Sequence, residues 1–115
     1  LQAGARPGPW MALQCVPDLG IGSVARCVKV DDTLPGIEEG LNAGMWTVGL
    51  ALSGSPAGLT LGEYESASAE QRREVRERVT PAFVGAGAHF VIDTIADLLP
   101  VLDEIEARLE GGERP

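Results

Sequence analysis

The segment VKVDDTLPGIEEGLNAGMWTVGLALSG, residues 28–54, decides the fold of this chain because it holds two apolar runs separated by a helix-like stretch. The first run belongs to SVARCVKV, residues 23–30, which is rich in valine and predicts a strand that ends at Asp31. The second run, MWTVGLAL at residues 45–52, is almost wholly apolar. Such a run is typical of a strand covered on both faces of a parallel sheet.

The stretch between the two strands, PGIEEGLNAG at residues 35–44, predicts a short helix. Ile37 and Leu41 lie four residues apart and would share its apolar face. Gly44 stands where a glycine commonly ends a helix. The segment therefore predicts the strand–helix–strand unit of an α/β protein.

The rest of the chain continues this alternation of helices and strands. We expect a helix that opens near Pro9 and runs to about Gly20, with Pro17 ending or kinking it. We also expect a helix at 68–87, a strand at 88–93 and an amphipathic helix at 95–112. This order predicts an α/β fold with a Rossmann-like parallel sheet and flanking helices. Because three strands are few for such a sheet, we expect residues 1–115 to be part of a larger domain.

Composition excludes several classes of function. The chain has 115 residues and a net charge of −8, which argues against binding to nucleic acid or to anionic membranes. No apolar run approaches the roughly 20 residues of a membrane span, and no signal peptide is recognisable. Cys15 and Cys27 lack metal-ligand spacing and are expected to be free thiols in the cytoplasm.

Asp31 and Asp32 form an acid pair where the first strand gives way to the helix. Ligands of open α/β sheets bind at the carboxyl ends of the strands, and Mg²⁺ commonly takes one or two carboxylates there. The alternative is that Asp32 and Thr33 cap the following helix while Asp31 faces solvent. Adjacent acids by themselves do not decide between these roles.

Three segments carry a resemblance to a known family. They are GARPGPWM (4–11), the segment 28–54 and GAHFVIDTIADLLPVLDEIE (87–106), with GLNAGMWTVGLALSG (40–54) the most specific part. Together they resemble the C-terminal part of the phosphonoacetaldehyde hydrolases, in the haloacid dehalogenase-like superfamily. The resemblance implies a haloacid dehalogenase-like core whose cap domain and nucleophile strand are absent from this chain.

The resemblance also implies an activity. These hydrolases cleave the carbon–phosphorus bond of phosphonoacetaldehyde to acetaldehyde and phosphate, with Mg²⁺, and are expected to be cytoplasmic homodimers. An aspartate nucleophile takes the phosphoryl group, and a cap-domain lysine forms a Schiff base with the aldehyde. Neither group is matched here, so no catalytic residue is present, and we expect this chain to lack activity alone.

The matched motifs assign three roles. Asp32 corresponds to an acidic metal ligand of the family, with Asp31 as a second candidate. Arg6 corresponds to an arginine that contacts the phosphoryl group, a task that suits its planar fork of donors. Thr33 would support the site by orienting Asp32 or by capping the helix.

The chain also departs from the family pattern. Asp31 stands where typical members carry glycine, and Gly36 stands where some relatives have a further acid near the metal. An extra residue in AGARP makes the match of Arg6 less direct. Lys29, the single lysine, does not match the Schiff-base lysine. The chain begins with Leu1, and the missing parts lead us to expect a C-terminal fragment of a longer hydrolase.

Three alternatives remain open at this point. The first is a phosphatase of small phosphate esters from the same superfamily. The second is a non-catalytic domain that pairs with a partner chain supplying the missing strands, and the third is an inert relic.

Other chemistry-bearing residues have simpler interpretations. His89, the single histidine, is expected to be structural, and Trp10 and Trp46 to pack against other elements. Asp93 is expected to cap the last helix, and the mixed charges of EQRREVRER indicate a solvated helix face.

Overall fold

A computed structural model of the chain describes residues 6–115, so that Leu1 and the four residues after it lie outside the described part. The elements in chain order are α1 (Trp10–Asp18), η1 (Val24–Arg26), β1 (Val28–Asp31), α2 (Leu34–Asn42), β2 (Trp46–Leu50), α3 (Leu61–Ser66), α4 (Ala69–Gly85), β3 (Phe90–Ile92), η2 (Ile95–Asp97) and α5 (Leu98–Glu110). The three strands form one parallel sheet in the order β1-β2-β3. The predicted α/β class with a parallel sheet is therefore confirmed.

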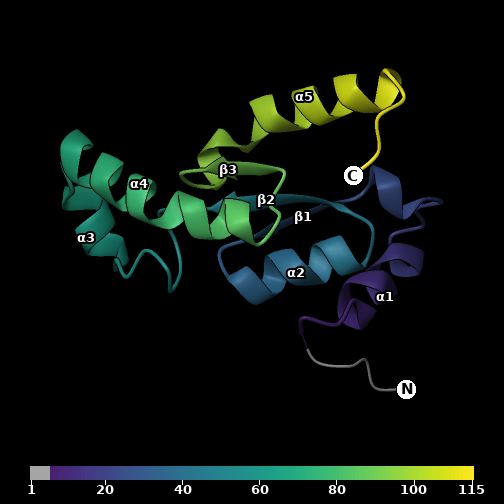
Figure 1. Ribbon diagram of the computed structural model, residues 1–115, viewed down its shortest axis with the longest axis horizontal. Helices are drawn as coiled ribbons and strands as arrows, with labels where there is room; N and C mark the ends of the chain where they lie inside the picture. Colours follow the sequence, from purple (N-terminus) through teal and green to yellow (C-terminus); the bar gives the residue numbers. More distant parts are fainter. Residues whose placement is uncertain (1–5) are drawn as a thin grey trace.

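The sheet is covered on both faces (Figure 1), with α2 and α4 on one side and α5 on the other. Val28 and Val30 of β1 pack with the buried Trp46 and Val48 of β2 toward α5, whose Ile105 is 3% exposed. This arrangement explains why β2 is apolar apart from Thr47, since both of its faces are buried.

The opposite face of the sheet is packed closely because glycines remove side chains at two contacts. A Cβ on Gly40 of α2 would lie 2.7 Å from Lys29 Cβ, and one on Gly49 of β2 would lie 2.6 Å from the Phe83 ring. Phe83 of α4 is completely buried. The glycines therefore let α2 and α4 approach the sheet and hold it from this side.

The start of β1 differs from the sequence-based prediction of a strand at 23–30. Residues Val24–Arg26 form a 3₁₀ turn, and the strand begins only at Val28. The turn is closed by bonds from Arg26 N to Ser23 O and from Cys27 N to Val24 O. These local bonds outweigh the strand preference of valine, although the predicted end at Asp31 is confirmed.

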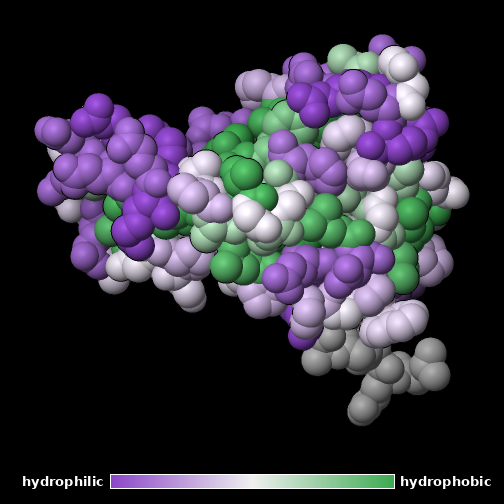
Figure 2. Space-filling model, in the orientation of Figure 1, coloured by the Kyte–Doolittle hydropathy of each residue, from purple (hydrophilic) through white to green (hydrophobic). Residues whose placement is uncertain are grey.

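The helices begin and end at the residues that their caps favour. Thr33 caps α2, Thr60 and Ser68 open α3 and α4 with capping boxes, and Gly44 follows α2 with a φ of +83°. Hydrophilic side chains cover α3 and the first half of α4, whereas hydrophobic ones gather between α4 and α5 (Figure 2). Within residues 6–115, no helix is long and apolar enough to cross a membrane.

Candidate functional site

The candidate site lies at the carboxyl end of β1, where the chain turns into α2. Asp31 is the last residue of the strand, and Thr33 is the N-cap of the helix. The Thr33 hydroxyl accepts a hydrogen bond from Gly36 N at 3.2 Å. This local geometry places a carboxylate beside the first turn of a helix, where the backbone dipoles favour negative charge.

Both oxygens of the Asp31 carboxylate have partners. Oδ2 accepts from Arg6 Nη2 at 2.5 Å and from Lys29 Nζ at 2.7 Å, and Oδ1 accepts from Thr33 N at 2.8 Å and Thr33 Oγ1 at 2.7 Å. Burial alone would raise the pKa of Asp31, but the hydrogen bonds from Lys29 and Thr33 and the charge of Lys29 outweigh it and lower that pKa. The Asp31 carboxylate is thus ionised and is held by contacts from Arg6, Lys29 and Thr33.

Glu39 of α2 completes this cluster from the opposite side. Its Oε1 lies 3.3 Å from Arg6 Nε and 3.6 Å from Lys29 Nζ, and its Oε2 accepts from Ala12 N at 3.0 Å. The Glu39 side chain is 5% exposed, against 35% for Arg6. We name Arg6, Lys29, Asp31 and Glu39 the four-charge cluster. Its two cations and two carboxylates cancel in charge.

The sequence analysis did not identify Lys29 and Glu39 as members of the site. A signal for Lys29 exists, because it lies two residues before Asp31 and a strand places such residues on one face. The sequence carries little signal for Glu39, since a glutamate next to Ile37 and Gly40 resembles an ordinary surface residue of a short helix. Only the packing of α1 and Arg6 over α2 buries it.

Asp32 faces away from the four-charge cluster. Its side chain lies against the loop that follows β2, where a Cβ on Gly54 would come within 2.6 Å of Asp32 Cγ. Gly54 has a φ of +88°, a conformation that favours glycine. The predicted acid pair is therefore split between two directions, and Thr33 binds Asp31 rather than Asp32.

The donor chemistry at this turn fits Mg²⁺ at Asp32 better than at Asp31. Asp31 is held by two cationic side chains, which would repel a divalent ion placed beside it. Asp32 has no side-chain hydrogen bond or ion pair to another described residue, and Mg²⁺ sites need only one or two carboxylates. Within residues 6–115, no group of three or more potential metal-binding side chains comes together.

His89, Asp93 and the buried Trp46 have structural roles in the fold, whereas Trp10, expected to pack against other elements, is 58% exposed. His89 Nδ1 accepts from Thr47 N at 3.0 Å, and its ring centroid lies 5.0 Å from that of Trp46. Asp93 does not cap the last helix as expected, because Thr94 is the N-cap of the 3₁₀ turn η2 and Asp97 is the N-cap residue of α5. Asp93 instead makes a two-point pair with Arg76, with both N–O distances 2.5 Å, and ties α4 to the end of β3.

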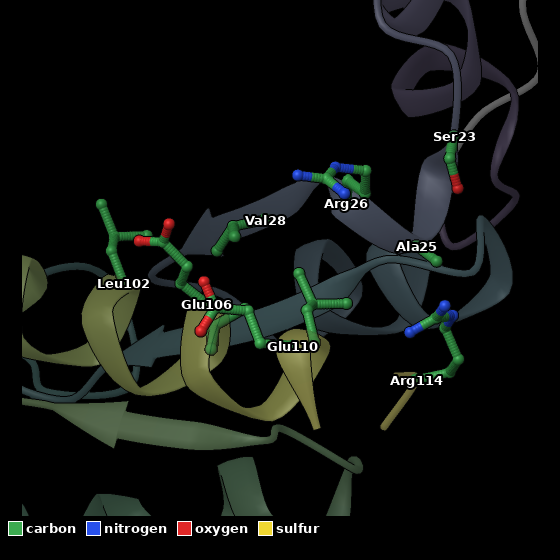
Figure 3. A pocket seen from close by; sticks show the side chains of 10 residues that line it. Ser23, Ala25, Arg26, Val28, Leu102, Glu106, Glu110 and Arg114 are labelled. Carbon is green, nitrogen blue, oxygen red and sulfur yellow. The ribbon is translucent and has the colours of Figure 1, made fainter. Parts of the chain in front are cut away.

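Two hollows of about 510 Å³ flank the edge strand β1. One lies between β1 and α5, and the side chains of Arg26, Val28, Glu106 and Arg114 line it (Figure 3). The other lies between α1 and β1, and Arg6, Lys29 and Glu39 contribute to its wall. The four-charge cluster therefore borders open space beside an edge strand.

Comparisons with known proteins show what the chain resembles in sequence and in fold. The chain is 58% identical over all 115 residues to phosphonoacetaldehyde hydrolases of Klebsiella pneumoniae and of Salmonella enteritidis, and it spans 43% of the length of each. A crystal structure of a phosphonoacetaldehyde hydrolase-like protein from Oleispira antarctica matches 96% of the chain with a TM-score of 0.92 and 47% identity, over 40% of its own length. No protein-family model matches the chain. By sequence and by fold, the chain is similar along its whole length to the C-terminal part of the phosphonoacetaldehyde hydrolases of the haloacid dehalogenase-like superfamily.

Proposed function

We propose that this chain supplies the phosphoryl- and metal-binding part of a phosphonoacetaldehyde hydrolase. In the reaction, the carbon–phosphorus bond breaks, the carbon takes a proton to give acetaldehyde, and phosphorus gains an oxygen from water to give phosphate. The curated relatives named above support this reaction, since they carry that activity in their names. The chain spans 43% of their length, so the complete reaction needs residues beyond this match.

The observation that carries the proposal is the arrangement of Arg6 around the end of β1. Its guanidinium is held by Asp31 and Glu39 at two different nitrogens, and Thr33 Oγ1 accepts from Nη2 at 3.0 Å. These contacts fix the plane of the fork at the strand end where α/β proteins bind ligands. The remaining donors of Arg6 can then meet phosphoryl oxygens.

Asp32 is the residue that would hold Mg²⁺, and its carboxylate fits that role without giving up another described side-chain partner. Bound Mg²⁺ would polarise a phosphoryl oxygen and neutralise charge on the phosphoryl group. In our proposal Arg6 orients the same group from the other side of the turn. Asp31 keeps Arg6 in place and is not a metal ligand.

The proposal assigns bond-making and bond-breaking groups to the part of the relatives that this chain does not match. These groups are the aspartate nucleophile on a further strand and the Schiff-base lysine of a cap domain. We further propose that residues 1–115 act as the C-terminal part of the core domain in a cytoplasmic homodimer. The open edge of β1, with a hollow on either side, is compatible with an additional strand.

A chimera tests the proposed function directly. The 115 residues replace the matching part of the Klebsiella pneumoniae hydrolase, and acetaldehyde release from phosphonoacetaldehyde is followed with Mg²⁺ present. We expect hydrolysis by the chimera and a loss of about 100- to 1000-fold in kcat/KM for Arg6→Ala, the usual effect of removing one donor to a developing charge.

Arg73→Ala is the matched control, because Arg73 is 58% exposed on α4 and pairs only with Glu70 at 3.6 Å among the described residues. It should leave kcat/KM unchanged within a factor of two or so. A folded chimera that releases no acetaldehyde, or an Arg6→Ala chimera as active as the Arg73→Ala control, contradicts the proposal.

A further inference from the structure

Asp31 and Gly36 are linked by a steric relation across the turn between β1 and α2. Gly36 lies in the first turn of α2 and is buried. A Cβ built on Gly36 would overlap the Asp31 carboxylate and the Nη2 atom of Arg6. The paired side chains of Asp31 and Arg6 therefore occupy the space that any side chain on residue 36 would need.

We propose that Asp31 is a positioning residue for Arg6, and that this turn has room for a single carboxylate that either residue 31 or residue 36 can carry. This inference rests on the proposed function only for what Arg6 binds. The positioning of Arg6 itself follows from the contacts within the four-charge cluster.

Asp31 and Glu39 contact Arg6 at different nitrogen atoms. Asp31 Oδ2 binds Nη2, whereas Glu39 Oε1 lies beside Nε. Two anchors on different nitrogens define the plane of a guanidinium, and one anchor leaves it free to rotate. Loss of Asp31 would therefore leave Arg6 attached but badly oriented.

A side chain on residue 36 can reach the position of the Asp31 carboxylate. The overlap shows that a Cβ there points at the present carboxylate, so an aspartate at residue 36 would extend toward Arg6 and Lys29 once Asp31 is removed. Residue 36 is the third residue of α2, where an acidic side chain is favourable. Two carboxylates at once would collide and repel one another.

The test uses four versions of the 115-residue chain: the natural sequence, Asp31→Gly, Gly36→Asp and the exchanged double variant. Thermal unfolding reports steric conflict, and the Arg6 Nε–H signal in a ¹H–¹⁵N spectrum, assigned by its absence in Arg6→Lys, reports guanidinium order. We expect Gly36→Asp to lower Tm by about 10 °C or to prevent folding. We expect the double variant to recover both the Tm and the Arg6 signal, and Asp31→Gly to lose the signal.

Gly36→Ala provides a second, milder measurement. It should lower Tm in the natural sequence, because its Cβ collides with Asp31 and with the Arg6 Nη2 that Asp31 holds in place. It should raise Tm in the Asp31→Gly background, where Arg6 is released and can move aside, because alanine favours a helix over glycine. Gly62→Asp is the matched control. Gly62 lies in the first turn of α3 with no neighbour near its Cβ position, so the added aspartate should be tolerated.

Several outcomes overturn the inference. It is wrong if Gly36→Asp is tolerated as well as Gly62→Asp, if Gly36→Ala has the same sign in both backgrounds, or if the double variant regains Tm without the Arg6 signal. None of these measurements depends on turnover. An inactive chimera would therefore refute the proposed function and leave the relation between residues 31 and 36 standing.

Discussion

Replacing Glu39 with glutamine removes one charge from the four-charge cluster while keeping its shape. The Glu39 side chain is 5% exposed and lies beside Arg6 Nε and Lys29 Nζ. A glutamine keeps an oxygen for the hydrogen bond from Ala12 N, so the change is mainly electrostatic. It leaves two cations facing one carboxylate in a half-buried setting.

The magnitude follows from the exposure of the three charged groups. Breaking a fully buried pair by removing one partner costs about 3–5 kcal/mol. Arg6 and Lys29 are 35% and 22% exposed, so water offsets part of that penalty. We therefore expect a loss of about 2 kcal/mol in the free energy of unfolding. With a urea m-value of about 1.5 kcal/mol/M, the unfolding midpoint should fall by roughly 1.3 M.

The assay is urea unfolding of the natural chain, Glu39→Gln, Lys29→Met and the double variant. The double variant restores charge balance, so its destabilisation should be at least about 1 kcal/mol smaller than the sum of the two single effects. Glu104→Gln is the control, because Glu104 is 53% exposed and pairs with Arg108 on the helix surface. A Glu39→Gln midpoint within the range of that control, or strictly additive effects, refutes the account of the cluster.

Two further predictions concern pH and metal. Burial, and to a lesser degree the charge of Arg108, lower the pKa of His89, so the unfolded chain binds the proton first as pH falls below about 6.5. Tm should therefore decrease as pH falls from about 7.5 toward the lowered pKa of His89 and then level off. In thermal scans, His89→Asn should reduce this dependence of Tm on pH. An unchanged dependence contradicts the prediction. In the chimera, a chelator should abolish acetaldehyde release, and Asp32→Asn should raise the Mg²⁺ concentration for half-maximal rate by at least about tenfold. Asp103→Asn on the exposed face of α5 is the control, and an Asp32→Asn chimera with the same Mg²⁺ dependence as that control would remove Asp32 from the metal site.

The sequence predicts the sheet well because strands that are buried on both faces appear as apolar runs in the sequence. Residues 45–52 are apolar apart from Thr47, and the structure buries Trp46–Gly49 in the centre of the sheet. The start of β1 is harder to predict, since Val24 and its neighbours close a 3₁₀ turn through backbone bonds that leave no mark on hydrophobic pattern. Patterns of burial are local in sequence, whereas competition between a turn and a strand is decided by context.

The candidate site is predictable only in part, for two physical reasons. Adjacent residues at a strand end point to opposite sides, so the acid pair separates into Asp31 beside Arg6 and Asp32 beside Gly54. This separation follows from strand geometry alone. The four-charge cluster depends on the three-dimensional fold, because Arg6 lies 25 positions before Asp31 in the chain and Glu39 becomes buried only when α1 packs on α2.

The charge balance of the site gives a reason for a metal in the proposed reaction. Arg6 and Lys29 are neutralised by Asp31 and Glu39, so the four-charge cluster offers geometry to an anionic substrate but little net attraction. Asp32 adds one more negative charge at the same turn, in a chain whose net charge is −8. A phosphonate would meet repulsion here unless a divalent cation reversed the local field. We infer that orientation by Arg6 and attraction by Mg²⁺ are separate tasks, which the two adjacent aspartates divide between them: Asp31 fixes the arginine, and Asp32 is left to hold the ion.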